Sequence, residues 1–357
     1  MLFTYTYVPH PLERLNRWLE QVVKGVWCTP QPQCQRELLE PEFRQVVDEI
    51  EENARTRDYL WGPICRIHDI CRDQLSAAQR EDLAKWFDDN NDIEGLCMGE
   101  PEIAPMTYRA IAQINPGLAQ ELEEFCTNLW TVIRNRKAVT GRLGTLTDHY
   151  KEFRKINRTG TCAFCGLARI EGVFSSIQED YDHYLPKGLY AFNSAALKNL
   201  VPICDKCNKK YKLQQDPLHK DGARRKAFYA YAESGHNINV RITLSSVDGA
   251  PIDPDNLSRD NIQIELTSAG REQELEGWKE IYKIEDRYKG VCCEGDTGGT
   301  YWLEQVLGEM RDTGRAQMDA LGTVLRAASA SRWADANFLK IPFLEGCLEA
   351  GFIREMR

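Results

Sequence analysis

Two pairs of cysteines have the spacing of metal ligands. Two residues separate the cysteines of each pair, and 38 residues separate the pairs, which are Cys162 with Cys165 and Cys204 with Cys207. Each pair forms a knuckle that can present two thiolates to one tetrahedral zinc ion, and two knuckles complete a four-sulfur site. Four protein ligands leave no position for a substrate, so we expect this zinc to be structural and to stabilise a unit that buries little core.

Polar residues that could do chemistry lie between the knuckles and directly after them. A histidine that is neutral near pH 7 suits the task of a general base. Carboxylate and amide oxygens are ligands for hard divalent cations such as Mg²⁺ or Mn²⁺. Taken singly, each residue has an ordinary structural alternative in a turn, on the surface or at a helix cap. The residues are Asp182, His183, Asn199 and Asn208.

The order of these residues resembles the motif of HNH (ββα-metal) endonucleases. The segments DHYLPK and NLVPxCxxCNKK are similar to the HNH defence nucleases of Septu and retron systems, and the match covers about residues 155–215. The resemblance implies that His183 activates water and that Asn199 braces the loop orienting this histidine. It also implies that Asp182 and Asn208 ligate a catalytic cation. Many members have His at the position of Asn208, and the amide favours Mg²⁺ or Mn²⁺ over softer metals.

Basic residues are concentrated around the same motif. The chain has a net charge of −9, whereas the segment from Lys151 to Lys226 contains fifteen Lys or Arg against eight Asp or Glu. A basic island in an acidic chain predicts a local site for a polyanion. The alternative is a solvated helix face. The candidate phosphate contacts, proposed as a group, are Lys187, Lys209, Lys210, Lys212, Arg224, Arg225 and Lys226.

The residues before the knuckles have the pattern of amphipathic helices. In LERLNRWLEQVVKGVW, which begins at Leu12, apolar residues recur at steps of three and four and draw one stripe along a helix. Further helices are expected near 38–54, 76–88 and 118–137, with Ser76 as an N-cap.

Beyond the second knuckle the pattern changes from helix to strand and back. Residues 237–244 (NINVRITL) and 261–266 (NIQIEL) alternate apolar and polar side chains and are rich in β-branched residues, which predicts two strands. Helical patterns return at 272–288 and 301–331.

These elements predict an α+β fold in three parts. We expect a helical domain over 1–150, a central zinc-stapled ββα-metal HNH unit over 151–232, and an α+β extension over 233–357. A chain of 357 residues is long enough for two or three domains.

Composition restricts the setting in which the protein works. No stretch approaches about 18 consecutive apolar residues, so no membrane span is expected. The start of the chain lacks the pattern of a secretory signal, which predicts a cytoplasmic protein. In a reducing cytoplasm, thirteen cysteines are free thiols or metal ligands rather than a disulfide framework.

The leading hypothesis is a divalent-metal-dependent endonuclease acting on DNA or RNA. The resemblance implies an antiviral defence effector with an ATPase or another defence-system protein as partner, docked on the helical domain. The rival hypothesis is a non-catalytic zinc-binding module that recognises nucleic acid or a protein. A redox role for the cysteine pairs is disfavoured because redox pairs usually act singly at a helix start. The substrate class, the identity of the partner and the oligomeric state stay open.

Overall fold

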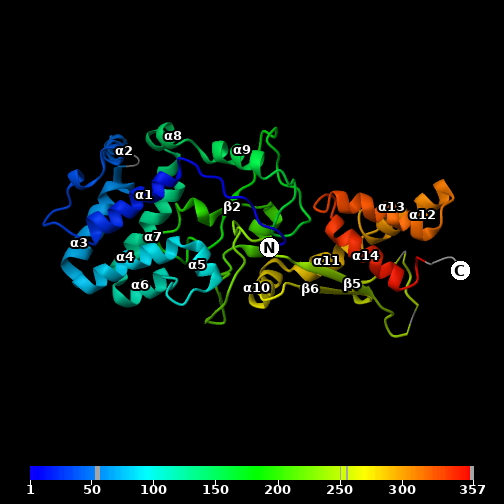
Figure 1. The fold of residues 1–357 in the computed structure, drawn as a ribbon. Helices are drawn as coiled ribbons and strands as arrows, with labels where there is room; N and C mark the ends of the chain where they lie inside the picture. The colour runs from blue at the N-terminus through cyan, green and yellow to red at the C-terminus, as the bar shows by residue number, and fades with distance from the viewer. Residues whose placement is uncertain (53–56, 250, 255, 354–357) are drawn as a thin grey trace.

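The computed structural model describes residues 1–52, 57–249, 251–254 and 256–353 (Figure 1). The expected α+β class is confirmed, since the structure is 54% helical and also contains a few small sheets. Within the described ranges each sheet has two antiparallel strands. No described helix has the length and apolar character needed to cross a membrane.

Helices fill the chain up to the first knuckle and gather in one half of the molecule (Figure 1). The stripe predicted from Leu12 is buried, with Leu15, Leu19, Val22 and Val26 in the core. Ser76 caps the helix predicted over 76–88, because its side chain accepts a hydrogen bond from the backbone N–H of Gln79. The elements are α1 (Glu13–Gln21), the π-helical η1 (Val22–Trp27), η2 (Arg36–Leu38), α2 (Pro41–Glu51), η3 (Arg57–Tyr59), α3 (Trp61–Gln74), α4 (Ala77–Asn91), α5 (Ile93–Met98), α6 (Tyr108–Ile114), α7 (Pro116–Thr131), η4 (Ile133–Asn135), α8 (Lys137–Leu143) and α9 (Leu146–Ile156).

The middle of the chain is built from short elements around the knuckles. Strand β1 (Tyr181–His183) pairs antiparallel with β2 (Leu200–Pro202), and Asp182 lies opposite Val201. The second knuckle leads into a π-helical segment, η6 (Cys207–Lys212). The remaining short elements are η5 (Leu197–Asn199), β3 (His219–Lys220) and β4 (Ala223–Arg224).

The predicted strands of the last part are confirmed as β5 (Asn239–Leu244) and β6 (Ile262–Thr267). The two long helical patterns are each split. Lys283 adopts a left-handed conformation (φ 50°) between α10 and α11, and Gly314 does so (φ 66°) after α12. Helix α14 packs against β5. The remaining elements are η7 (Arg259–Asn261), α10 (Glu272–Tyr282), α11 (Ile284–Cys292), α12 (Gly299–Thr313), α13 (Gln317–Ala330) and α14 (Asn337–Glu349).

Two hydrophobic cores meet at the β1–β2 hairpin. One core lies among the N-terminal helices and includes Tyr181 and Leu200 of the hairpin. The other contains both knuckles, the C-terminal helices and Val201. Met1 also belongs to this second core, so the start of the chain leaves the helical region and packs on the knuckles. The hairpin carrying Asp182 and His183 is therefore held from both sides.

Candidate active site and metal centre

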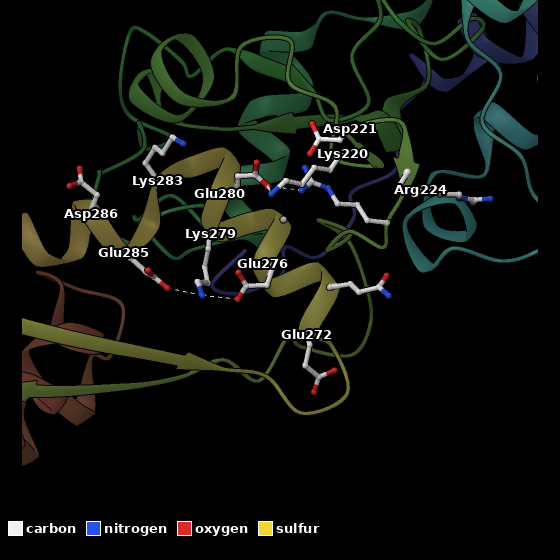
Figure 2. A pocket seen from close by; sticks show the side chains of 14 residues that line it. Lys220, Asp221, Arg224, Glu272, Glu276, Lys279, Glu280, Lys283, Glu285 and Asp286 are labelled. Atoms are coloured by element: carbon white, nitrogen blue, oxygen red, sulfur yellow. Dashed lines mark hydrogen bonds and ion pairs between the residues drawn. The ribbon is translucent and has the colours of Figure 1, made fainter.

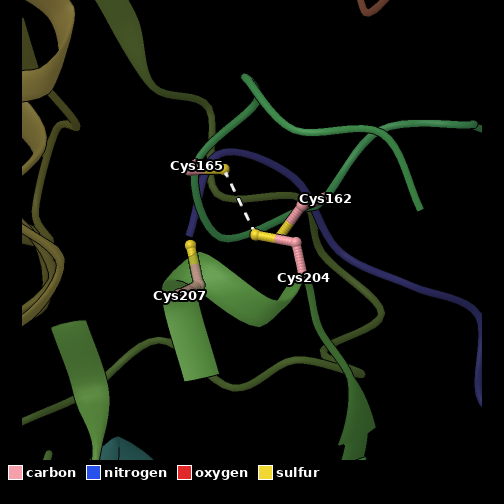
Figure 3. A group of neighbouring side chains, drawn as sticks. All are labelled: Cys162, Cys165, Cys204 and Cys207. Carbon is pink, nitrogen blue, oxygen red and sulfur yellow. Dashed lines mark hydrogen bonds between the residues drawn. The ribbon is translucent and has the colours of Figure 1, made fainter. Parts of the chain in front are cut away.

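The four knuckle cysteines converge on one point. Their sulfur atoms lie within 4.8 Å of one another, all four residues are buried, and Sγ of Cys165 is 4.0 Å from Sγ of Cys204 (Figure 3). A tetrahedron with Zn–S bonds of about 2.3 Å places sulfur atoms about 3.8 Å apart. The arrangement therefore fits a metal ion such as zinc, as the spacing of the cysteines predicted.

Groups from the C-terminal helices surround this cluster. The guanidinium of Arg287, on α11, donates a hydrogen bond to Sγ of Cys207 (3.3 Å) and stacks on the ring of Tyr211 (4.3 Å). Trp278 Nε1 donates to the backbone carbonyl of Phe164 (2.7 Å). A buried cation beside four thiolates offsets part of their charge. The sequence did not point to Arg287, since it lies 80 positions after Cys207.

His183 occupies an enclosed position at the end of β1. The residue is half-buried, and its ring packs edge-on against Trp130 at 4.6 Å between centroids. Burial lowers the pKa of His183 to about 3, so the imidazole is neutral near pH 7. Nε2 lies 2.9 Å from the carbonyl oxygen of Ser194, which can only accept. Nε2 therefore carries the hydrogen, and Nδ1 keeps a lone pair able to accept a proton.

Asn199 fixes the loop that contains Ser194. The side chain is fully buried, and its Oδ1 accepts a hydrogen bond from the backbone N–H of Leu185 (2.8 Å). Its Nδ2 donates to the carbonyls of Leu185 (2.9 Å) and Asn193 (3.4 Å). These bonds close the connection between β1 and β2, and thereby position the carbonyl that orients His183.

Asp182 is buried beside a lysine. The Lys212 ammonium donates to Oδ1 of Asp182 (3.2 Å) and to the carbonyl of His183 (2.9 Å). It lies 3.1 Å from Oδ2, and the side chains of Lys212 and Asp182 are only 1% and 5% exposed. Burial raises the pKa of Asp182, and the neighbouring ammonium opposes this shift.

The position of Lys212 differs from the surface phosphate contact expected for it. Lys212 is one turn beyond Asn208 on η6, on the side that faces β1, and its charge is used inside the protein. Lys209 is exposed but forms ion pairs with Asp180 (2.8 Å) and Asp205 (3.0 Å).

The other candidate phosphate contacts vary in their surroundings. Lys210 is exposed and Lys187 is half-buried. Arg224 donates to the backbone carbonyl of Ile103. Arg225 is paired with Glu280. Lys226 is exposed.

Asn208 and Asp182 are the residues that the sequence predicts as ligands of a catalytic cation. Oδ2 of Asp182 is buried and receives no hydrogen bond from the described residues. Asn208 is half-buried on the first turn of η6, and the hydrogen bonds found for it within the described ranges involve its backbone alone. Carboxylate and amide oxygens are the ligand types that Mg²⁺ or Mn²⁺ prefers, and a shared cation between these two residues stays a prediction. The ammonium of Lys212 already neutralises the carboxylate, so a cation there would compete with it.

Two cavities lie near candidate residues. One, of about 730 Å³, is lined by Asn208, Tyr181, Trp130 and Arg134, and so adjoins the wall against which His183 packs. Neither Trp130 nor Arg134 was expected from the sequence.

The other cavity, of about 840 Å³, lies between the β3–β4 turn and α10 (Figure 2). Its charged groups are largely paired with one another: Lys220 with Glu280, and Lys279 with Glu276 and Glu285. The residues predicted to bind the catalytic cation or to act on water are not among its lining residues. Its greater volume therefore does not identify the chemical centre.

Comparison of the chain with protein-family models, with curated proteins and with solved structures finds no match.

Proposed function

We propose that the protein is a divalent-metal-dependent endonuclease of the HNH type, which hydrolyses phosphodiester bonds of nucleic acid. The observation that carries the proposal is the state of His183. Its imidazole is neutral, its Nε2 is engaged by the Ser194 carbonyl, and its Nδ1 is left as the acceptor. A zinc-binding scaffold does not need the combination of this histidine with Asp182 and Asn208.

In this proposal each residue of the chain has a distinct task. Nδ1 of His183 takes the proton from the attacking water, as a general base. Asn199 is a positioning residue, because it fixes the loop whose carbonyl orients the imidazole. Asp182 and Asn208 would hold Mg²⁺ or Mn²⁺, which when bound stabilises negative charge on the phosphate and the leaving oxygen. The knuckle cysteines would hold a structural zinc ion.

The resemblance to defence nucleases extends the proposal to the biological setting. An antiviral effector working with an ATPase or another defence-system protein needs a docking surface, and the N-terminal helices are our candidate for it. Nucleic acid cleavage in the cytoplasm would require such a partner or trigger for control.

The second candidate function is a zinc-binding module without catalysis. The observation that favours it is the buried Asp182–Lys212 pair, which uses the carboxylate internally. Within the described ranges, the knuckles are also the only group of three or more His, Cys, Asp or Glu able to hold a metal ion.

Cleavage assays distinguish the two candidates. The zinc-loaded full chain would be incubated with plasmid DNA, single-stranded DNA or tRNA, with Mg²⁺ or Mn²⁺. We expect metal-dependent cleavage that is lost in His183→Ala and kept in His219→Ala, a half-buried histidine outside both metal-binding groups. Cleavage that survives in His183→Ala would show that His183 is not the base. Binding without cleavage, with cellular partners added, would favour the zinc-binding module.

A further inference from the structure

The cavity beside Asn208 is built from segments that are far apart in the sequence. Its wall contains Trp130 at the end of α7 and Arg134 in η4, the start of α9, and residues 178–181 leading into β1. Trp130 also contacts the ring of His183, 4.6 Å away between centroids. The N-terminal helices therefore contribute directly to the surroundings of the proposed base.

Arg134 is held in place by Trp130. Its guanidinium lies 4.0 Å above the ring of Trp130, and its Nε donates to the backbone carbonyl of the same residue (3.1 Å). Across the described part of the chain, no carboxylate pairs with Arg134, and its terminal nitrogens donate to no protein acceptor. Several other arginines, among them Arg36 and Arg142, are paired with Asp or Glu. The free donors of Arg134 form a planar fork that can bind two oxygens of one phosphate.

The acidic residues in the cavity wall are already engaged. Asp180 pairs with Lys209 (2.8 Å), and Glu179 accepts a hydrogen bond from the backbone N–H of Glu171 (3.2 Å). Burial raises the pKa of Glu179. Arg134 is the one Lys or Arg among the described residues that line this cavity.

We propose that Arg134 binds a backbone phosphate of the nucleic acid in this cavity, next to His183. This inference rests on the endonuclease proposed above and names a substrate-binding residue for it. Trp130 acts as a positioning residue, because one ring contacts both the guanidinium and the imidazole. The helical region would then be part of the substrate site as well as the proposed docking surface.

The test measures binding separately from cleavage. Affinity for a fluorescein-labelled single-stranded oligonucleotide would be measured by anisotropy over a range of salt concentrations, with the zinc-loaded full chain and no Mg²⁺ or Mn²⁺. We expect Arg134→Gln to weaken binding about tenfold and to reduce the slope of log affinity against log salt by about one. Lys137→Gln, which removes the same charge from an exposed position outside the cavity, should bind like the wild type.

A second variant keeps the inference testable if Arg134→Gln is unstable. Arg134→Lys retains the charge but loses the fork, so we expect binding several-fold weaker than that of the wild type. Wild-type affinity in both Arg134 variants, or a wild type that does not bind the oligonucleotide, would overturn the inference.

Cleavage assays on the same variants separate the two proposals. Cleavage by the wild type with unchanged binding by the Arg134 variants would reject the inference and leave the endonuclease standing. A selective loss of binding in those variants, with no cleavage by the wild type even after cellular partners are added, would support the phosphate contact and reject the endonuclease.

Discussion

The buried pair of Asp182 and Lys212 is the most consequential contact at the scale of single residues. A buried ion pair adds little net stability, but removing one partner leaves an uncompensated charge. Here the carboxylate is also the proposed ligand of a catalytic cation, and the ammonium neutralises it in the absence of that cation. The carboxylate oxygens of Asp182 thus pair with Lys212 in the fold and would bind the cation in the proposed reaction.

Replacing Lys212 by methionine tests both roles of Asp182. We expect Lys212→Met to lower the free energy of unfolding by about 3–5 kcal/mol without Mg²⁺, because Asp182 is left buried and unpaired. Mg²⁺ should then stabilise this variant more than the wild type, since the ammonium no longer competes. Urea denaturation with and without Mg²⁺ measures both effects.

The double variant Asp182→Asn/Lys212→Met serves as the control for this experiment. It lacks the buried charge, so it should be more stable than Lys212→Met alone and insensitive to Mg²⁺. An equal response of wild type and Lys212→Met to Mg²⁺ would argue against Asp182 as a ligand.

At the scale of elements, His149 connects α9 to β1. It is 1% exposed, its Nδ1 lies 2.5 Å from the hydroxyl of Tyr181, and its Nε2 lies 3.0 Å from the carbonyl of Val8. The carbonyl accepts from Nε2, so Nδ1 accepts from Tyr181, and the ring is neutral. Burial lowers the pKa of His149 to about 4, whereas its ordinary value is 6.5.

This shift predicts how acid affects stability. The unfolded chain binds a proton at His149 below pH 6.5, while the folded chain does so only below about 4. The contribution of His149 is complete above pH 6.5 and is lost as the pH falls from 6.5 to about 4, by about 3 kcal/mol. Unfolding by urea at several pH values should show a smaller acid loss for His149→Gln. Equal pH dependence in the two proteins would contradict the assignment.

The elements differ in how far the sequence predicts them. Helices α1 and α4 follow from an apolar stripe and a capping serine, which are local signals. Helix α14 was not predicted, because it is buried on several sides, contains Pro342 and has no single apolar face. The breaks at Lys283 and Gly314 depend on left-handed residues inside otherwise continuous patterns.

The residues of the candidate site also differ in how far local sequence predicts them. The spacing of the cysteines predicted their convergence, because each knuckle is formed by neighbouring residues. Trp130, Ser194 and Lys212 reach the proposed catalytic residues only through the tertiary fold, so no local pattern could have shown these contacts. The chemistry assigned to His183 and Asp182 stays a prediction until cleavage is measured.

At the scale of the whole molecule, the knuckles sit where distant parts of the chain meet. The backbone N–H of Leu2 donates to the carbonyl of Ala163 (2.8 Å), and the hydroxyl of Tyr288 donates to the carbonyl of Cys165 (3.0 Å). The start of the chain and helix α11 thus both contact the first knuckle. The cluster belongs to one hydrophobic core, while most of the N-terminal helices belong to the other. Metal binding should therefore stabilise the core that contains the knuckles more than the core of the N-terminal helices.

Removal of zinc is expected to loosen one half of the molecule first. Four thiols without a cation no longer hold the knuckles together, and binding of structural zinc contributes about 10 kcal/mol or more in small zinc domains. Hydrogen exchange after chelation should accelerate over residues 160–210 and in α10 and α11, while α3 and α7 stay protected. Cys204→Ser should reproduce this pattern, and zinc should reverse it in the wild type alone. Uniform loss of protection would mean that the two cores unfold as one unit. Unchanged protection in a protein shown to be metal-free would mean that the knuckles need no metal.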